Sequence, residues 1–193
     1  MKIDNELDIE IYEGVYEPSD DTFLLLSMID VNGGEEILEI GCGSGIISLH
    51  CSAQNCDVLS VDKDERALKN TKTNARKNDL NISVKKSHLF SNITKDDWDM
   101  IIFNPPYLPK GGILPEDDRW DGGKRGDEVI VRFLEDAGEY LKPDGKLYTC
   151  YSSLSPTERI EELIEKKYRI TKIEQKDFFF ETLYGLELNK EKE

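Results

Sequence analysis

A chain of 193 residues, 38% of them apolar and 34% charged, is long enough for one globular domain with a strongly solvated exterior. Its formal net charge of −15 argues against a nucleic-acid binder, because such proteins usually carry positive surfaces. The sequence shows no signal peptide and no apolar run near the roughly 18 residues of a membrane span, so we expect a cytoplasmic protein that does not bind membranes.

Apolar residues switch repeatedly between the two-residue period of strands and the 3.6-residue period of helices. In chain order, the expected elements are strand 36–40, helix 46–54, strand 57–62, helix 64–78, strands 82–86 and 98–103, helix 127–141, strand 145–151, a helix after Ser155, and strands 168–176 and 181–188. This alternation predicts a doubly wound α/β fold with a mostly parallel seven-stranded sheet. The last two strands are close enough in sequence to pair antiparallel.

Cap and turn residues predict where several helices begin and end. Ser19 is expected to cap an N-terminal helix that has Thr22 on its inner face. Residues 143–145, Pro-Asp-Gly, are expected to end the helix before them. Ser155 is expected to cap the next helix, with Pro156 as its first residue.

The four cysteines are Cys42, Cys51, Cys56 and Cys150. They form no CxxC pair and have no histidine at ligand spacing, so we expect packed, reduced thiols and no metal site.

A glycine loop follows the first strand, in the run Glu39-Ile40-Gly41-Cys42-Gly43-Ser44-Gly45. Glycines here let the backbone approach a ligand at the carboxyl edge of a parallel sheet. A dinucleotide site needs a further glycine where this chain has Ile46, which weakens an NAD or FAD hypothesis. Taken alone, the loop is equally compatible with a simple tight turn.

Two acidic residues narrow the class of ligand that this loop can bind. Glu39 would repel a pyrophosphate but suits a ligand that carries an ammonium and a sulfonium group. Asp62 ends the second strand, about 20 residues after the loop, where an acid can accept both ribose hydroxyls. Together these residues resemble the cofactor signature of class I S-adenosylmethionine-dependent methyltransferases, which implies a Rossmann-like fold and that cofactor.

A second motif, Asn104-Pro105-Pro106-Tyr107, follows strand 98–103 and is expected at the same edge of the sheet. An amide or aromatic amine nitrogen is a poor nucleophile, so its NH2 group must be held in line with the donated methyl. The Asn104 side-chain oxygen and the Pro105 carbonyl can each accept one N–H, and the prolines keep the turn rigid. Tyr107 offers an aromatic face for a planar group.

This motif is shared by adenine-N6 and protein-glutamine methyltransferases. With the segments Val15–Leu26 and Trp120–Gly126, nearly the whole chain resembles the HemK/PrmC-type protein glutamine methyltransferases, in the short eukaryotic and archaeal branch. The resemblance implies one methyltransferase domain over 1–193, with about 1–31 completing the site. It also implies an enzyme that methylates the glutamine N5 of the GGQ motif in class I translation release factors.

The resemblance also implies the role of each site residue. The implied cofactor-binding residues are Thr22, Glu39, Gly41, Gly43, Asp62, His88, Leu89 and Asn104. The implied substrate-binding residues are Asn104, Pro105, Pro106 and Tyr107, and the catalytic role falls to Asn104, Pro105 and Tyr107.

This chain departs from the family pattern at the position expected to bind the adenine of the cofactor. The family usually places an acid after the third strand, where this chain has Ser87-His88-Leu89-Phe90. A neutral His88 can accept one hydrogen bond from the adenine amine, or it can be an exposed loop residue. Leu89 and Phe90 are expected to pack against the adenine ring.

Several alternatives stay open on the sequence alone. The resemblance also implies a small zinc-binding activator protein that covers apolar surface near the third strand, although Lys85 and Lys86 can instead be charges that protect that edge. Phe178-Phe179-Phe180 is either a buried turn or a partner surface. The competing functions are an adenine-N6 methyltransferase on DNA or RNA, and a cofactor-binding partner protein without activity.

Overall fold

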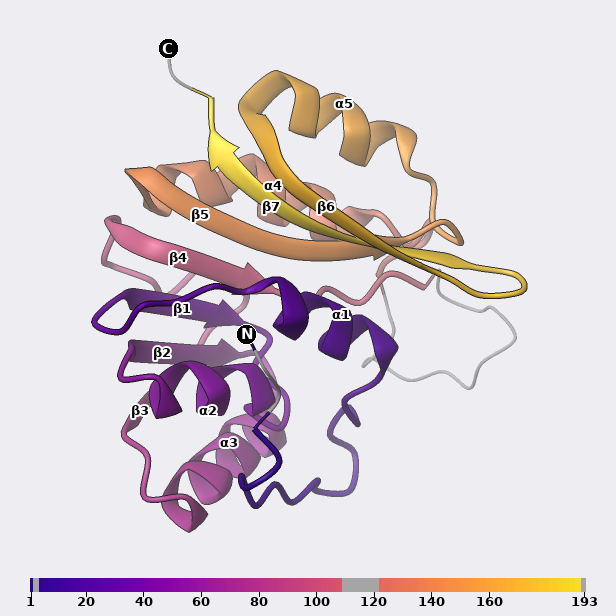
Figure 1. The fold of residues 1–193 in the computed structure, drawn as a ribbon. Coiled ribbons are helices and arrows are strands. Elements are labelled where there is room, and N and C mark those ends of the chain that lie inside the picture. Colours follow the sequence, from indigo (N-terminus) through magenta and orange to yellow (C-terminus); the bar gives the residue numbers. More distant parts are fainter. Residues whose placement is uncertain (2–3, 109–121, 192–193) are drawn as a thin grey trace.

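The computed structural model describes residues 1, 4–108 and 122–191, and they form a seven-stranded sheet with helices on both faces (Figure 1). The strands are β1 (Glu36–Ile40), β2 (Asp57–Asp62), β3 (Ile82–Lys86), β4 (Trp98–Phe103), β5 (Leu141–Ser152), β6 (Tyr168–Asp177) and β7 (Thr182–Lys190). The helices are α1 (Asp20–Met28), α2 (Ile46–Ala53), α3 (Glu65–Lys77), α4 (Glu128–Tyr140) and α5 (Glu158–Lys167). The predicted doubly wound α/β class is confirmed.

The sheet order β3-β2-β1-β4-β5-β7-β6 brings the loops of interest together. Neighbours from β3 to β5 are parallel, whereas β7 runs antiparallel to both β5 and β6. The carboxyl ends of β1, β2, β4 and β5 therefore share one edge with the turn between β6 and β7. Ligands of open α/β sheets bind at such an edge.

Alternate residues of the central strands enter two separate cores, as the two-residue period requires. Ile37 and Ile102 face α1 and α2, whereas Leu38 and Ile101 face α4 and α5. All four of these side chains are fully buried. Packing on both faces holds β1 and β4 rigidly, and these strands carry the glycine loop and the Asn104 motif.

Two predicted boundaries were wrong. Residues 143–145 do not end a helix, because β5 already begins at Leu141, which pairs with Trp98 before the register shifts. Ser155 does not cap α5, whose N-cap is Thr157. The Ser155 hydroxyl instead donates to the backbone oxygen of Tyr107, so a residue that resembles a helix cap supports the second motif.

All four cysteines are buried free thiols. Within the described ranges, no group of His, Cys, Asp and Glu is arranged to hold a metal ion. None of the helices described is both long and apolar enough to span a bilayer.

Candidate active site

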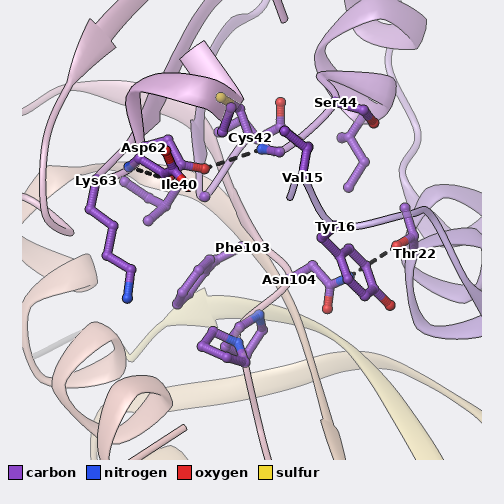
Figure 2. A pocket seen from close by; sticks show the side chains of 18 of the residues that line it. Val15, Tyr16, Thr22, Ile40, Cys42, Ser44, Asp62, Lys63, Phe103 and Asn104 are labelled. Atoms are coloured by element: carbon purple, nitrogen blue, oxygen red, sulfur yellow. Dashed lines mark hydrogen bonds between the residues drawn. The ribbon is translucent and has the colours of Figure 1, made fainter. Parts of the chain in front are cut away.

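A cavity of about 610 Å³ opens at the carboxyl edge of the sheet. Its walls come from the glycine loop, the end of β2, the 86–89 turn, the Asn104 motif and the segment around Val15 and Tyr16. Figure 2 shows Asp62 and Lys63 at one end and Asn104 with Thr22 at the other, with Phe103 between them. The sequence-predicted site residues are therefore brought together in one cavity.

The glycine loop is a backbone cradle. Gly41, Gly43 and Gly45 have φ of +67°, +53° and +82°, a region that favours glycine. A Cβ on Gly45 would lie 2.7 Å from Thr71 Cγ2, so that position has no room for a side chain. A Cβ on Gly43 would meet nothing within 4 Å, which leaves the loop backbone open to a ligand.

Glu39 lines the cavity but is only 3% exposed, because it also caps α2. Its Oε2 accepts the Ser48 backbone N–H at 3.1 Å and the Ser48 hydroxyl. Gly45, the N-cap of α2, has no side chain that can make this bond. Burial raises the pKa of Glu39 to about 8, although the bonds from Ser48 oppose that shift.

Asp62 is held at the end of β2 by two backbone donors. Gly43 N donates to Oδ2 at 3.2 Å and Asp64 N donates to Oδ1 at 2.9 Å. Burial raises the pKa of Asp62, while these two N–H donors lower it. Each carboxylate oxygen has two lone pairs, so this fixed group can still accept hydroxyls from a ligand.

The turn after β3 places His88 and Leu89 in the cavity wall. Leu89 has φ of +49°, a strained value for a side chain of this kind, and the Ser87 hydroxyl supports it by donating to the Leu89 oxygen at 2.7 Å. His88 is exposed, and its pKa is lowered by partial burial and by nearby Arg132 and Lys63. A neutral imidazole can accept a hydrogen bond.

Phe90 does not lie at the cavity, contrary to expectation. Its ring stacks on Tyr140 at 4.4 Å and on Phe133 at 5.7 Å between centroids, in the core under α4. The positive φ at Leu89 turns the chain, and Leu89 alone of this pair lines the cavity.

Asn104 stands at the other end of the cavity, and a chain of hydrogen bonds sets its orientation. Its Nδ2 donates to Thr22 Oγ1 at 3.1 Å (Figure 2). Thr22 Oγ1 in turn donates to Asp21 Oδ1 at 3.1 Å. On the other side, Cys150 Sγ donates to Asn104 Oδ1 at 3.0 Å. The amide nitrogen therefore points at α1, and the amide oxygen keeps one lone pair for a ligand.

Asp21 is a site residue that the sequence analysis missed. It is 3% exposed, and its carboxylate accepts the Tyr16 hydroxyl at 2.7 and 2.9 Å and the Tyr107 hydroxyl at 3.3 Å, besides Thr22. Burial and this carboxylate raise the pKa of both tyrosines, so both hydroxyls remain protonated donors. An acid in the first turn of a helix is ordinarily solvated, so the residue type alone did not indicate that Asp21 is buried at the site.

The Pro-rich turn after Asn104 is anchored at several points. Pro105 and Tyr107 are buried, and Ser155 donates to the Tyr107 oxygen from the loop after β5. Gly122 packs against the turn so tightly that a Cβ there would lie 2.8 Å from the Pro106 oxygen. Of the predicted segment Trp120–Gly126, the first two residues lie outside the described residues.

An extended N-terminal segment leads into the cavity wall and is bound to α3 by asparagines spaced four residues apart. Asn70, Asn74 and Asn78 accept the backbone N–H groups of Tyr12, Glu10 and Asp8 at 2.8–3.0 Å. Their amide groups donate back to the backbone oxygens of the same segment. This ladder holds the chain just before Val15 and Tyr16, and its signal in the sequence is the four-residue spacing of the three asparagines along one helix face.

Comparison with known proteins identifies the family. The model of the methyltransferase small domain matches residues 16–180. The chain belongs to this methyltransferase family, in its HemK-type branch. It is 39% identical over 157 residues to a Methanocaldococcus jannaschii relative assigned as a protein N5-glutamine methyltransferase, covering 76% of this chain and 77% of that one. The eRF1 methyltransferase catalytic subunit mtq2 of Schizosaccharomyces pombe is 28% identical over 85% of this chain and 84% of its own.

Solved structures agree with the fold of this methyltransferase. A methyltransferase from Pyrococcus furiosus superimposes with a TM-score of 0.73 at 23% identity, covering 95% of this chain and 89% of that one. The family uses S-adenosylmethionine, and the cavity fits that cofactor. It offers a glycine backbone cradle and two acidic side chains, Glu39 and Asp62, which suit a ligand that bears an ammonium, a sulfonium and a ribose diol but no phosphate.

Proposed function

We propose that this methyltransferase transfers a methyl group to the side-chain amide nitrogen, N5, of a glutamine in a protein substrate. The arrangement of Asn104 is the observation that supports this proposal. Asn104 lines the cavity, its Nδ2 is bonded to Thr22, and its Oδ1, which accepts from Cys150, keeps a lone pair as a preorganised acceptor for an incoming N–H. The relatives named above as glutamine and eRF1 methyltransferases support the same substrate class.

The chemistry needs orientation more than acid or base strength. When bound, S-adenosylmethionine supplies an electrophilic methyl group on a sulfonium. Asn104 Oδ1 and the Pro105 carbonyl each accept one N–H of the substrate amide, which directs the nitrogen lone pair along the transfer axis. Tyr107 supports the plane of the amide. Because the donors and acceptors are already in place, positioning provides most of the rate acceleration.

The proposed cofactor contacts divide between the two ends of the cavity. Asp62 accepts the ribose hydroxyls, Leu89 packs on the adenine, and His88 accepts a hydrogen bond from the adenine amine. Glu39 and Thr22 face the amino-acid end, and Gly41 and Gly43 provide open backbone.

We further propose a class I release factor as the substrate, with the glutamine of its GGQ motif as the acceptor. One domain over 1–193 then carries the whole site, in the cytoplasm where translation occurs. A small zinc-binding activator is proposed at β3, which lies at the edge of the sheet.

An adenine-N6 methyltransferase is the alternative, because its substrate nitrogen needs the same two acceptors. The net charge of −15 disfavours a nucleic-acid substrate. The decisive experiment offers labelled cofactor with purified release factor and, separately, with adenine-containing oligonucleotides. Label on the release factor supports the proposal, and label on the oligonucleotide alone contradicts it.

A further inference from the structure

The turn between β6 and β7 exposes three consecutive aromatic side chains. Phe179 is 91% exposed and Phe180 is 82% exposed, and their rings meet edge to face at 4.5 Å between centroids. Leu154, which is 49% exposed, lies in the loop that bonds to the start of β7. We call Leu154 and Phe178–Phe180 the aromatic tip. Burying such groups is favourable, so their exposure at one place indicates a contact surface.

The aromatic tip lies at the catalytic edge of the sheet, because β6 runs parallel to β5 and the hairpin turns where β5 ends. Figure 1 shows this hairpin projecting beyond the ends of the neighbouring strands. Cys150, which donates to Asn104, pairs with Gly185 in β7. Phe180 is five residues before Gly185, which places it about 16–17 Å from that level at the rise of a strand.

Two sets of contacts fix the aromatic tip relative to the site. On one side, Ser152 Oγ donates to Glu181 at 2.6 Å, and Glu181 accepts the Phe178 N–H through its backbone oxygen at 2.7 Å. On the other, Lys176 lies over the Phe178 ring at 5.5 Å and pairs with Asp20 at 2.7 Å, next to Asp21. These contacts hold the base of the hairpin turn against the end of β5 and the start of α1.

We propose that the aromatic tip docks the methyl-accepting protein, at an apolar patch away from the glutamine itself; this rests on the proposed function. A specific interface covers about 800 Å² per partner, which corresponds to a disc with a radius of about 16 Å. A disc of that size, about 32 Å across, covers both Asn104 and the aromatic tip when it is centred between them. Aromatic side chains are also enriched in such interfaces.

The test compares a folded substrate with a short one. In the double variant Phe179→Ser and Phe180→Ser, KM for intact release factor should rise about tenfold with kcat unchanged. KM for a short GGQ peptide, which fills only the cavity, should match that of the wild type. The control is Ile170→Ser, which removes a side chain of 46% exposure from the far part of β6. It should leave both KM values unchanged.

Each of the following results would contradict the docking proposal, and each can be told apart from the others. A KM for intact release factor within twofold of wild type shows that the aromatic tip does not contact it. An equal loss with the short peptide places the effect in the cavity instead. A wild-type dimer that dissociates on substitution, with KM unchanged, assigns the aromatic tip to self-association. A wild-type enzyme that methylates neither substrate overturns the proposed function and docking together. Matched melting temperatures exclude misfolding of the variants.

Discussion

Asn104 Nδ2 donates to Thr22 Oγ1 at 3.1 Å, across 82 residues of sequence. Thr22 can accept this bond because its own hydroxyl proton is directed to Asp21. The N-terminal helix α1 thus sets the orientation of the Asn104 amide. Helix α1 and the Asn104 motif are coupled through one threonine hydroxyl.

Thr22→Val should reduce kcat about tenfold or more, because an isosteric methyl cannot accept the Asn104 N–H and the amide can rotate. The unpaired amide should also lower the free energy of unfolding by about 1–3 kcal/mol. Steady-state kinetics and denaturant unfolding measure the two effects. Thr22→Ser keeps the hydroxyl and should restore most of kcat; equal activity of the Val and Ser variants would show that the bond plays no part.

Asp21→Asn should lower kcat more than it raises KM for the cofactor. The amide provides one acceptor oxygen where the carboxylate serves Tyr16, Thr22 and Tyr107, so Asn104 and the tyrosines lose their fixed positions. We expect a loss of kcat of about tenfold to a hundredfold. The matched control is Asp20→Asn in the same turn of α1, which removes only a surface ion pair with Lys176 and should stay near wild type.

Asn70→Ala should weaken cofactor binding while kcat at saturation changes little. Asn70 accepts the Tyr12 N–H and donates to the Glu10 oxygen, so its loss frees the segment that leads to Val15 and Tyr16. Isothermal titration with S-adenosylhomocysteine should show affinity reduced about tenfold. Asn78→Ala, at the opposite end of the ladder, should have a smaller effect. Equal affinity of Asn70→Ala and wild type for S-adenosylhomocysteine would show that the ladder does not support cofactor binding in the cavity.

The raised pKa of Glu39 predicts that the free energy of unfolding depends on pH. Its pKa is raised from 4.5 to about 8 by burial, so the folded state retains a proton that the unfolded state has released. The stabilisation is therefore fully present below pH 4.5 and is lost as pH rises towards about 8. The slope is at most about 1.4 kcal/mol per pH unit. Urea unfolding across this pH range should show the free energy of unfolding declining in wild type but not in Glu39→Gln. Parallel curves for the two proteins would show that Glu39 does not cause the decline.

Patterns that are local in sequence predicted most of the fold and the residues that the glycine loop, Asp62 and the Asn104 motif contribute to the cavity. The strand periodicity, the glycine spacing and the position of Asp62 each depend on neighbouring residues, and each lies where it was expected. The position of the Asn104 motif at the same edge was predicted because the motif follows a strongly apolar strand.

The features that were missed depend on contacts between distant segments. Asp21 looks like an ordinary helix-start acid until α1 packs against β5 and β7 and buries it. Ser155 has the features of a helix cap, yet the Tyr107 oxygen binds its hydroxyl. Phe90 is turned into the core by the positive φ of Leu89, which no propensity predicts for leucine.

The identity of the methylated atom tests the central proposal most directly. Peptide mass spectrometry of a release factor incubated with this enzyme and S-adenosylmethionine should locate a single methyl group on the amide of the GGQ glutamine. The Asn104→Ala variant, which should still bind cofactor, should leave that glutamine unmodified. A methyl group on any other residue of the release factor, or transfer to adenine alone, would contradict the account.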